Sequence, residues 1–158
     1  MKTILILSAV LMLCGCASIR IVPENEKQVS KVYDYPNLSK TEIYEKSRQW
    51  LAETYTSAQD VIQYQDKDSG KVIGRGSKTM YHNLSNPFLI GIFTCTYAII
   101  IEAKDNKARI TFNTYTLCAD SIRQPLNNQN MIDEMNTSLT EAAENFNTYI
   151  KSKKVDKW

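Results

Sequence analysis

The sequence contains too little histidine and cysteine to build most catalytic or metal sites. Histidine occurs once, as His82, and the four cysteines include no C-x-x-C pair. A closed zinc site needs four nitrogen or sulfur ligands, and nucleophilic catalysis needs a base beside the nucleophile. We therefore expect a protein that is not an enzyme, with no catalytic residue, no metal site and no cofactor.

The sequence also lacks an excess of either charge. Lysine and arginine total 19 against 17 aspartates and glutamates, so the net charge is +2. A nucleic-acid-binding domain usually carries a clustered basic face. The local excess of basic residues in this sequence is confined to its last residues, "KSKKVDKW". The sequence therefore predicts no nucleic-acid partner, and residues 153–158 are interpreted as a basic tail.

The uncharged segment near the start of the chain is too short to cross a membrane as a helix. It runs from Thr3 to Ile19, 17 residues, and it ends in small side chains. A spanning helix needs about 20 mostly apolar residues. A basic Lys2, an apolar middle and a small-residue end are instead typical of a signal peptide. We assign residues 1–15 to an export signal.

The end of this signal resembles a bacterial lipobox. Leu13, Cys14 and Gly15 precede Cys16, and in lipoproteins such a cysteine takes a diacylglyceryl group and fatty acyl chains such as palmitate. Carried over by position, Cys16 is the lipidation site, and its acyl chains would anchor the protein durably. The alternative is an ordinary signal cut after Ala17. The resemblance implies a lipid-anchored protein of the bacterial cell envelope and favours the outer over the inner membrane.

The rest of the chain predicts one α+β domain. Residues 16–28 are interpreted as the lipidated cysteine and a linker, and residues 29–152 as the domain, because the hydrophobic period alternates between 2 and 3.6. The expected order is β-α-β-β-β-β-α, with an antiparallel sheet of four to five strands and two helices on one face. Glycines at 74 and 76 would let a helix lie close to the sheet. The expected elements are a strand from Val29, a helix at 40–55, strands at 60–66, 71–82, 88–104 and 107–119, and a helix at 129–152.

Residues 40–77 resemble an uncharacterised family of bacterial envelope proteins. The matching stretch is "KTEIYEKSRQWLAETYTSAQDVIQYQDKDSGKVIGRGS", a tryptophan-bearing helix followed by a hairpin with glycines after its turn. The family is the DUF4468-like domain of unknown function, found in Bacteroidetes lipoproteins. The resemblance implies a TBP-like fold and brings no catalytic residues, and a fold of that name does not imply DNA binding.

Two cysteines remain in the expected domain, Cys95 and Cys118. If Asp105 and Asn106 form the turn between their strands, residue 95 faces residue 116, and Cys118 projects on the same face one diagonal step away. A wider loop or a bulge would set the two cysteines directly opposite each other. An exported domain matures where thiols oxidise, and such a bridge would contribute about 3 kcal/mol. Both a disulfide and two free thiols remain open.

The connection before the long strand is more apolar than a hairpin loop requires. It contains Pro87, Phe88, Leu89 and Ile90. These side chains either cap the core or, if exposed, form a contact site for a partner.

The favoured interpretation is a non-enzymatic module that docks an envelope protein or a cell-wall component, through its sheet or through the 83–90 loop. The alternative is a module that binds a small molecule or lipid between its helices and its sheet. A hydrolase is the third reading, and it would require His82 or the acidic turn at 66–68 to act.

Overall fold

The computed structural model describes residues 21–55, 61–83, 90–119 and 122–152. These ranges contain six strands, two α-helices and one short 3-10 helix. In chain order they are η1 (Glu24–Glu26), β1 (Val29–Asp34), α1 (Lys40–Thr54), β2 (Ile62–Asp66), β3 (Lys71–Asn83), β4 (Ile90–Lys104), β5 (Lys107–Ala119), β6 (Ile122–Pro125) and α3 (Gln129–Ser152).

All six strands belong to one antiparallel sheet. Its order is β1-β5-β4-β3-β2, and β6 pairs with the second half of β5, beyond the end of β1. The predicted α+β architecture is confirmed, with two helices and an antiparallel sheet. The sheet has one strand more than the four to five expected, because β6 pairs over residues that we expected to be a linker.

Both helices begin with side-chain caps that the sequence supplies. Ser39 and Glu42 form a capping box at the start of α1, with Ser39 N donating to Glu42 Oε2 at 3.0 Å and Glu42 N to Ser39 Oγ at 3.2 Å. At α3, Met131 N donates to Asn128 Oδ1 at 3.1 Å. Such caps satisfy amide groups that have no partner inside the helix.

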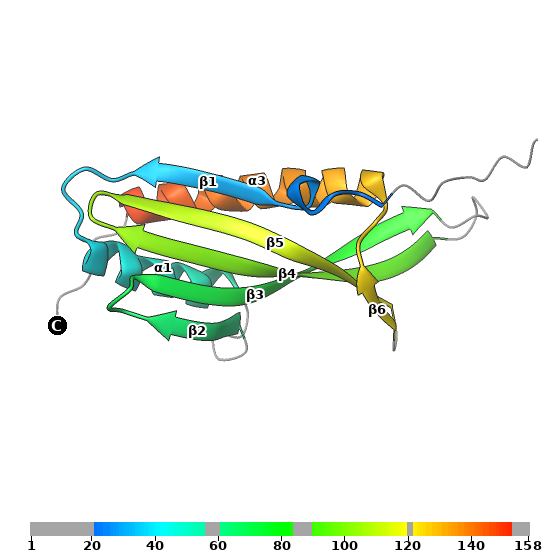
Figure 1. Cartoon of the computed structure of the whole chain (residues 1–158), viewed down its shortest axis with the longest axis horizontal. Coiled ribbons are helices and arrows are strands. Elements are labelled where there is room, and N and C mark those ends of the chain that lie inside the picture. The colour runs from blue at the N-terminus through cyan, green and yellow to red at the C-terminus, as the bar shows by residue number, and fades with distance from the viewer. Residues whose placement is uncertain (1–20, 56–60, 84–89, 120–121, 153–158) are drawn as a thin grey trace, which may run out of the picture.

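Both helices cover the same face of the sheet and lie behind it in Figure 1. The two helices meet where the Trp50 and Phe146 rings lie edge to face, 5.2 Å between centroids, and Trp50 Nε1 donates to Asn145 Oδ1. The core between helices and sheet includes Ile43, Leu51, Ile99, Ile101, Ile110 and Phe112, all fully buried. Burial of this apolar layer is the main force that holds helices and sheet together.

The expected close approach of a helix holds at one of the two glycines. A Cβ on Gly74 would lie 3.5 Å from Cδ2 of Leu51 on α1. At Gly76 the neighbour is instead a ring of the sheet itself, because a Cβ there would lie only 2.5 Å from Tyr97. An aromatic ring on β4 therefore fills the space that the missing side chain leaves on β3.

The opposite face of the sheet is covered by neither α1 nor α3, and we call it the open face. The strand register places alternate residues of strands β1 to β5 on this face. Its members include Ser30, Val32, Tyr64, Ile73, Arg75, Ser77, Thr79, Tyr81, Ile92, Thr94, Thr96, Ala98, Ile100, Glu102, Arg109, Thr111, Asn113, Thr116 and Cys118.

One end of the sheet, which we call the turn end, is held by hydrogen bonds among three connections. It comprises Asn37 to Lys40, Asp68 to Gly70, and Asp105 with Asn106. Lys40 N donates to Asp105 Oδ1 at 2.7 Å, and Lys40 Nζ donates to the Asp68 carbonyl at 2.7 Å. The backbone adds Asn106 N to Leu38 O at 2.9 Å and Ala103 N to Gly70 O at 2.8 Å. These bonds join the start of α1 to both hairpin turns.

A bulge divides β5 into two parts. Ala98 of β4 pairs with Asn113, but Thr96 pairs with Thr116, so β5 has one extra residue between the two pairs. Within this bulge Thr114 has a φ of 57°, in the left-handed region that a β-branched residue rarely adopts. Every residue of β5 after the bulge is therefore shifted by one position relative to a regular hairpin.

The chain joins the domain earlier than expected. Val22 and Lys27 are each only 2% exposed, although both lie in the predicted 16–28 linker. Lys27 Nζ donates to Asn127 Oδ1 at 2.9 Å, and Asn136 Nδ2 donates to the Glu26 carbonyl at 2.8 Å. The packed part of the chain thus starts at Val22 rather than at Val29, and the linker assignment is wrong for residues 22–28.

Candidate functional site

Several residues that the sequence singled out lie outside the described ranges. These are the lipobox and the lipidation site, Leu13, Cys14, Gly15 and Cys16, and most of the apolar loop, Pro87, Phe88 and Leu89. Ile90, the last residue of that loop, begins β4, where it pairs with Asn83. Within the described ranges no helix is both long and apolar enough to span a bilayer.

Of the two alternatives left open for Cys95 and Cys118, the structure shows the free thiols. The bulge pairs Cys95 with Leu117 and Thr94 with Cys118, so the two thiols project from opposite faces of the sheet. Cys95 is buried on the helix side, Cys118 lies on the open face, and both are free thiols. The prediction that they share a face is wrong because it assumed a hairpin without a bulge. Burial raises the pKa of the Cys95 thiol to about 11.

The single histidine lies near the end of β3, where it pairs with Gly91. Among the described residues, no three histidine, cysteine or acidic side chains gather closely enough to hold a metal ion. In the acidic turn at 66–68, the Asp66 side chain accepts hydrogen bonds from the backbone of the same turn. Its Oδ1 accepts from Asp68 N at 2.9 Å and from Ser69 N at 3.3 Å. A hydrogen bond from the Ser69 side chain, followed by these backbone hydrogen bonds, holds the pKa of Asp66 below its usual range.

A row of apolar side chains runs across the open face from the β2 edge of the sheet to its central strand β4, and we call it the apolar row. It contains Tyr64 on β2, Ile73 on β3 and Ile100 on β4, which are paired neighbours in the strand register. Tyr64 is 49% exposed, and the two isoleucines are partly exposed. Because each side chain of the row comes from a different paired strand, the sheet fixes their spacing at about 5 Å.

Polar side chains continue and border the apolar row. Thr111 of β5 pairs with Ile100, and its hydroxyl lies 3.0 Å from that of Ser30 on β1. In the next row Arg109 Nε donates to Glu102 Oε2 at 2.8 Å, and Arg109 Nη2 lies 2.6 Å from the same oxygen. Two nitrogens of one guanidinium on one carboxylate oxygen fix the position of both side chains. This part of the open face therefore has an apolar centre and an ordered polar border.

The space between the helices and the sheet is filled by side chains. Trp50, Phe112 and Phe146 are fully buried there, and the Tyr55 and Tyr97 hydroxyls lie 3.4 Å apart. Burial raises the pKa of both phenols, so they stay protonated at neutral pH. The described part of this layer is thus a packed core.

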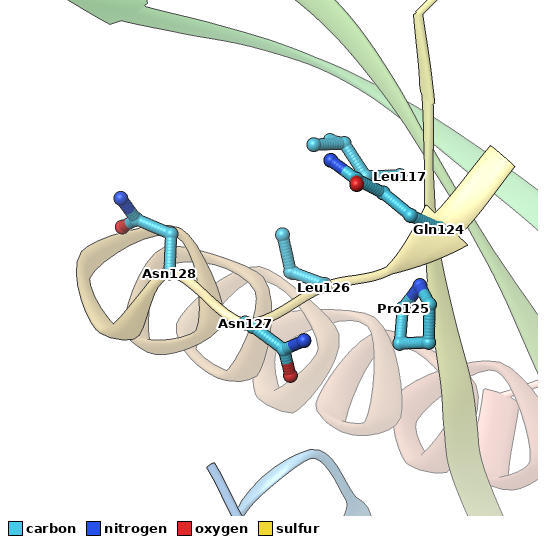
Figure 2. Close-up of a pocket in the computed structure, with 6 residues that line it drawn as sticks. All are labelled: Leu117, Gln124, Pro125, Leu126, Asn127 and Asn128. Atoms are coloured by element: carbon cyan, nitrogen blue, oxygen red, sulfur yellow. The ribbon is translucent and has the colours of Figure 1, made fainter. Parts of the chain in front are cut away.

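A shallow hollow lies where β6 leads into α3. Figure 2 shows its lining residues, with Gln124 and Leu117 on one side and the turn into α3 on the other. Its volume is about 320 Å³, and the lining is completed by Pro125, Leu126, Asn127 and Asn128. Asn127 is already engaged by Lys27 Nζ. The hollow thus lies at the junction of β5, β6 and the turn into α3, and one of its lining side chains is used to hold the amino-terminal segment.

Sequence analysis missed the apolar row, although one signal for it is present. Ile99, Ile100 and Ile101 are consecutive, and a strand with one exposed face should alternate apolar with polar residues. Ile99 and Ile101 face the core, so Ile100 must lie on the other face. Its neighbours Ile73 and Tyr64 become visible as partners only when the strand register is known.

The family comparison matches the centre of the chain. The family described as "Domain of unknown function (DUF4468) with TBP-like fold" matches residues 30–116, more than half of the 158 residues. This range contains β1 to β4, α1 and most of β5. No curated protein matches the chain.

Two solved structures share the fold. A DUF4468 family protein from Bacteroides ovatus superposes with a TM-score of 0.61 at 13% identity, covering 90% of this chain and 95% of that one. A TBP-like protein from Parabacteroides distasonis gives a TM-score of 0.59 at 14% identity, covering 80% of this chain and 94% of that one. The family match and the shared architecture lead to the same conclusion: the chain belongs to the DUF4468 family of domains with a TBP-like fold.

Proposed function

We propose that this protein is a lipid-anchored module of the bacterial cell envelope, without enzymatic activity, that docks a protein partner on the open face of its sheet. The lipid anchor would be attached at Cys16, and the apolar row would form the centre of the docking surface. The proposal therefore separates two tasks, attachment through the amino-terminal chain and recognition through the sheet.

The single observation that carries the docking proposal is the exposure of apolar side chains on the open face. Of the six strongly exposed large hydrophobic residues in the described ranges, four lie on this face: Val32, Tyr64, Tyr81 and Ile92. Scattered single hydrophobic residues are normal on a surface. Here Tyr64 is paired with Ile73, and Ile73 is paired with Ile100, so the apolar area is contiguous across three strands.

The chemistry of this surface favours a protein partner. Interfaces between proteins are enriched in tyrosine and arginine and combine an apolar centre with a polar rim. Tyr64 supplies the exposed ring, and Arg109 and Glu102 stand beside the row as an ordered ion pair. A partner that covers the row could also pair with this arginine and carboxylate at its margin.

Site-specific photocrosslinking in cells tests the docking surface. A photoreactive amino acid at Tyr64 should capture a defined partner, because its side chain is half exposed at one end of the apolar row. The matched control is the same amino acid at Glu141, which is exposed on α3 and points away from the sheet. A partner captured equally from both positions, or from Glu141 alone, would contradict the proposal.

Membrane fractionation of a Cys16→Ser variant tests the anchor. The native chain should remain with the membranes after high-salt washing, because several acyl chains give durable attachment. The variant should be released, and intact-mass measurement should show the loss of the acyl groups. An unacylated native chain would refute the anchor and leave the docking surface to be judged by the crosslinking experiment alone.

The alternative of a ligand between the helices and the sheet gains no support from the described core. Trp50, Ile99 and Phe112 are fully buried in that layer. A ligand would have to displace such side chains at a cost of several kcal/mol.

A further inference from the structure

We infer that the end of the sheet opposite the turn end rests on the lipid surface and inserts apolar side chains into its interfacial region. We call this the entry end, because the amino-terminal chain joins the domain here at the buried Val22, and its exposed apolar side chains are Tyr81, Ile92 and Ile122. The inference rests on the proposed lipid anchor. It adds which end of the domain meets the bilayer and which side chains touch it.

The length of chain before the domain restricts the orientation. Val22 is buried against the domain, and only six peptide steps separate it from Cys16. Six residues span at most about 22 Å when fully extended. The 15-residue strand β4 alone is about 50 Å long. A domain anchored at Cys16 therefore cannot rest its turn end on the membrane with its strands perpendicular to the bilayer.

The two strand pairs that reach the entry end carry exposed apolar side chains. Tyr81 and Ile92 are direct partners across β3 and β4, and they are 67% and 68% exposed. Ile122 at the start of β6 is 63% exposed. Figure 1 shows the β3–β4 pair, β6 and the start of the described chain (blue) at the same end of the molecule, with β3 and β4 extending past the start of α3.

The side-chain chemistry fits the interface between lipid and water. Tyrosine prefers the headgroup level of a bilayer, where its ring is apolar and its hydroxyl remains hydrated. Arg123 follows Ile122 and is exposed on the open face, where it can meet lipid phosphates. A few inserted apolar side chains bind weakly on their own, but acyl chains that already hold the protein at the surface make such contacts effective.

Depth-dependent fluorescence quenching tests the inference on the acylated full-length chain. The chain is reconstituted into phosphatidylethanolamine–phosphatidylglycerol vesicles that contain brominated phospholipids. Tyr81→Trp and Ile122→Trp probe the entry end. The controls are Tyr64→Trp and Val32→Trp, whose native residues are 49% and 61% exposed on strands that do not reach this end. The unsubstituted chain supplies the background from its own tryptophans.

The emission added at positions 81 and 122 should be quenched several-fold more strongly than that added at positions 64 and 32. Equal quenching at all four positions, or none at 81 and 122 in a chain that floats with the vesicles, would overturn the inference and leave the anchor intact. A chain that does not float with the vesicles would refute the anchor itself, and with it this orientation.

Discussion

The two ends of the sheet are built in different ways. At the turn end, hydrogen bonds join the start of α1 to both hairpin turns, and Gly70 and Asn106 adopt the positive φ angles that these turns require. At the entry end, the β3–β4 pair extends past the start of α3, and Tyr81, Ile92 and Ile122 are exposed. The comparison suggests that stability is concentrated at one end and surface chemistry at the other.

This division has a physical cause. Hydrogen bonds of fixed geometry contribute to the free energy of unfolding, whereas exposed apolar side chains contribute little to it. Substitutions at the turn end should therefore change stability, and substitutions at the entry end should change association. Four measurements test this contrast between the two ends.

The largest effect is expected for Gly70→Ala at the turn end. Gly70 has a φ of 70°, and a Cβ there would lie 2.5 Å from the Ala103 carbonyl oxygen. Left-handed backbone and this clash together should lower the free energy of unfolding by at least about 2 kcal/mol. Urea denaturation measures the loss. Gly74→Ala is the control and should lose less, because its φ is not in the left-handed region and its nearest neighbour would be 3.3 Å away.

A gain in stability is expected at the bulge that lies between the two ends. Thr114 is exposed with a φ of 57°, and asparagine tolerates this conformation better than a β-branched residue. Thr114→Asn should raise the free energy of unfolding by about 1 kcal/mol. Thr116→Asn, two residues later on the same strand, should give no gain. If both variants were equally destabilised, the strain assigned to Thr114 would be wrong.

A smaller, pH-dependent effect is expected for Glu45, near the turn end. Burial works to raise the pKa of this carboxyl, but hydrogen bonds and attraction from Lys67 and Arg48, each 3.0 Å away, outweigh it and lower the pKa below 4.5. A lowered folded-state pKa stabilises the protein above the unfolded-state pKa, and this contribution is lost as the pH falls through the folded-state value.

Glu45→Gln should therefore lower stability by at most about 0.5 kcal/mol at neutral pH, because the pairs are partly exposed to solvent. At a pH below the lowered folded-state pKa of Glu45, the variant and the native chain should be equally stable. Glu141→Gln on α3 is the control variant. A difference between Glu45→Gln and the native chain that persists in acid would show that the substitution acts through packing rather than charge.

The smallest effect on stability is expected at the entry end. Tyr81→Ser removes a ring that is 67% exposed, and the free energy of unfolding should change by less than about 0.5 kcal/mol. At the turn end, Asp105→Ala removes the acceptor for Lys40 N and should cost about 1 kcal/mol. Thermal and urea unfolding of this pair compares the two ends directly. A larger loss for Tyr81→Ser would reverse the proposed division.

Much of the fold follows from local signals in the sequence. The Ser39 and Glu42 capping box marks the start of α1, and the β-branched run before Asp105 marks β4 and its turn. These signals succeed because the residues act on their immediate neighbours. Strand β6 was missed because its four residues are all exposed and end in Pro125, so that no alternation marks them as a strand.

The candidate site was harder to predict, because it depends on register. One extra residue at Thr114 places Cys118 on the opposite face from Cys95, and of the two alternatives left open the structure shows the free thiols. Threonine is not a residue that indicates a left-handed bulge. The apolar row likewise joins Tyr64, Ile73 and Ile100 from three strands, and no local pattern states which residues of separate strands are partners.

The packing of the first described residues has a mechanical consequence. Between Ile21 and the start of β1, the chain is held by the buried side chain of Val22, by the Glu26 carbonyl on Asn136 and by Lys27 on Asn127. Force applied to the amino-terminal chain would be transmitted first to α3 and to the connection that precedes it. Strand β1 would peel from β5 only after these contacts had ruptured, so the sheet is shielded from tension at the terminus.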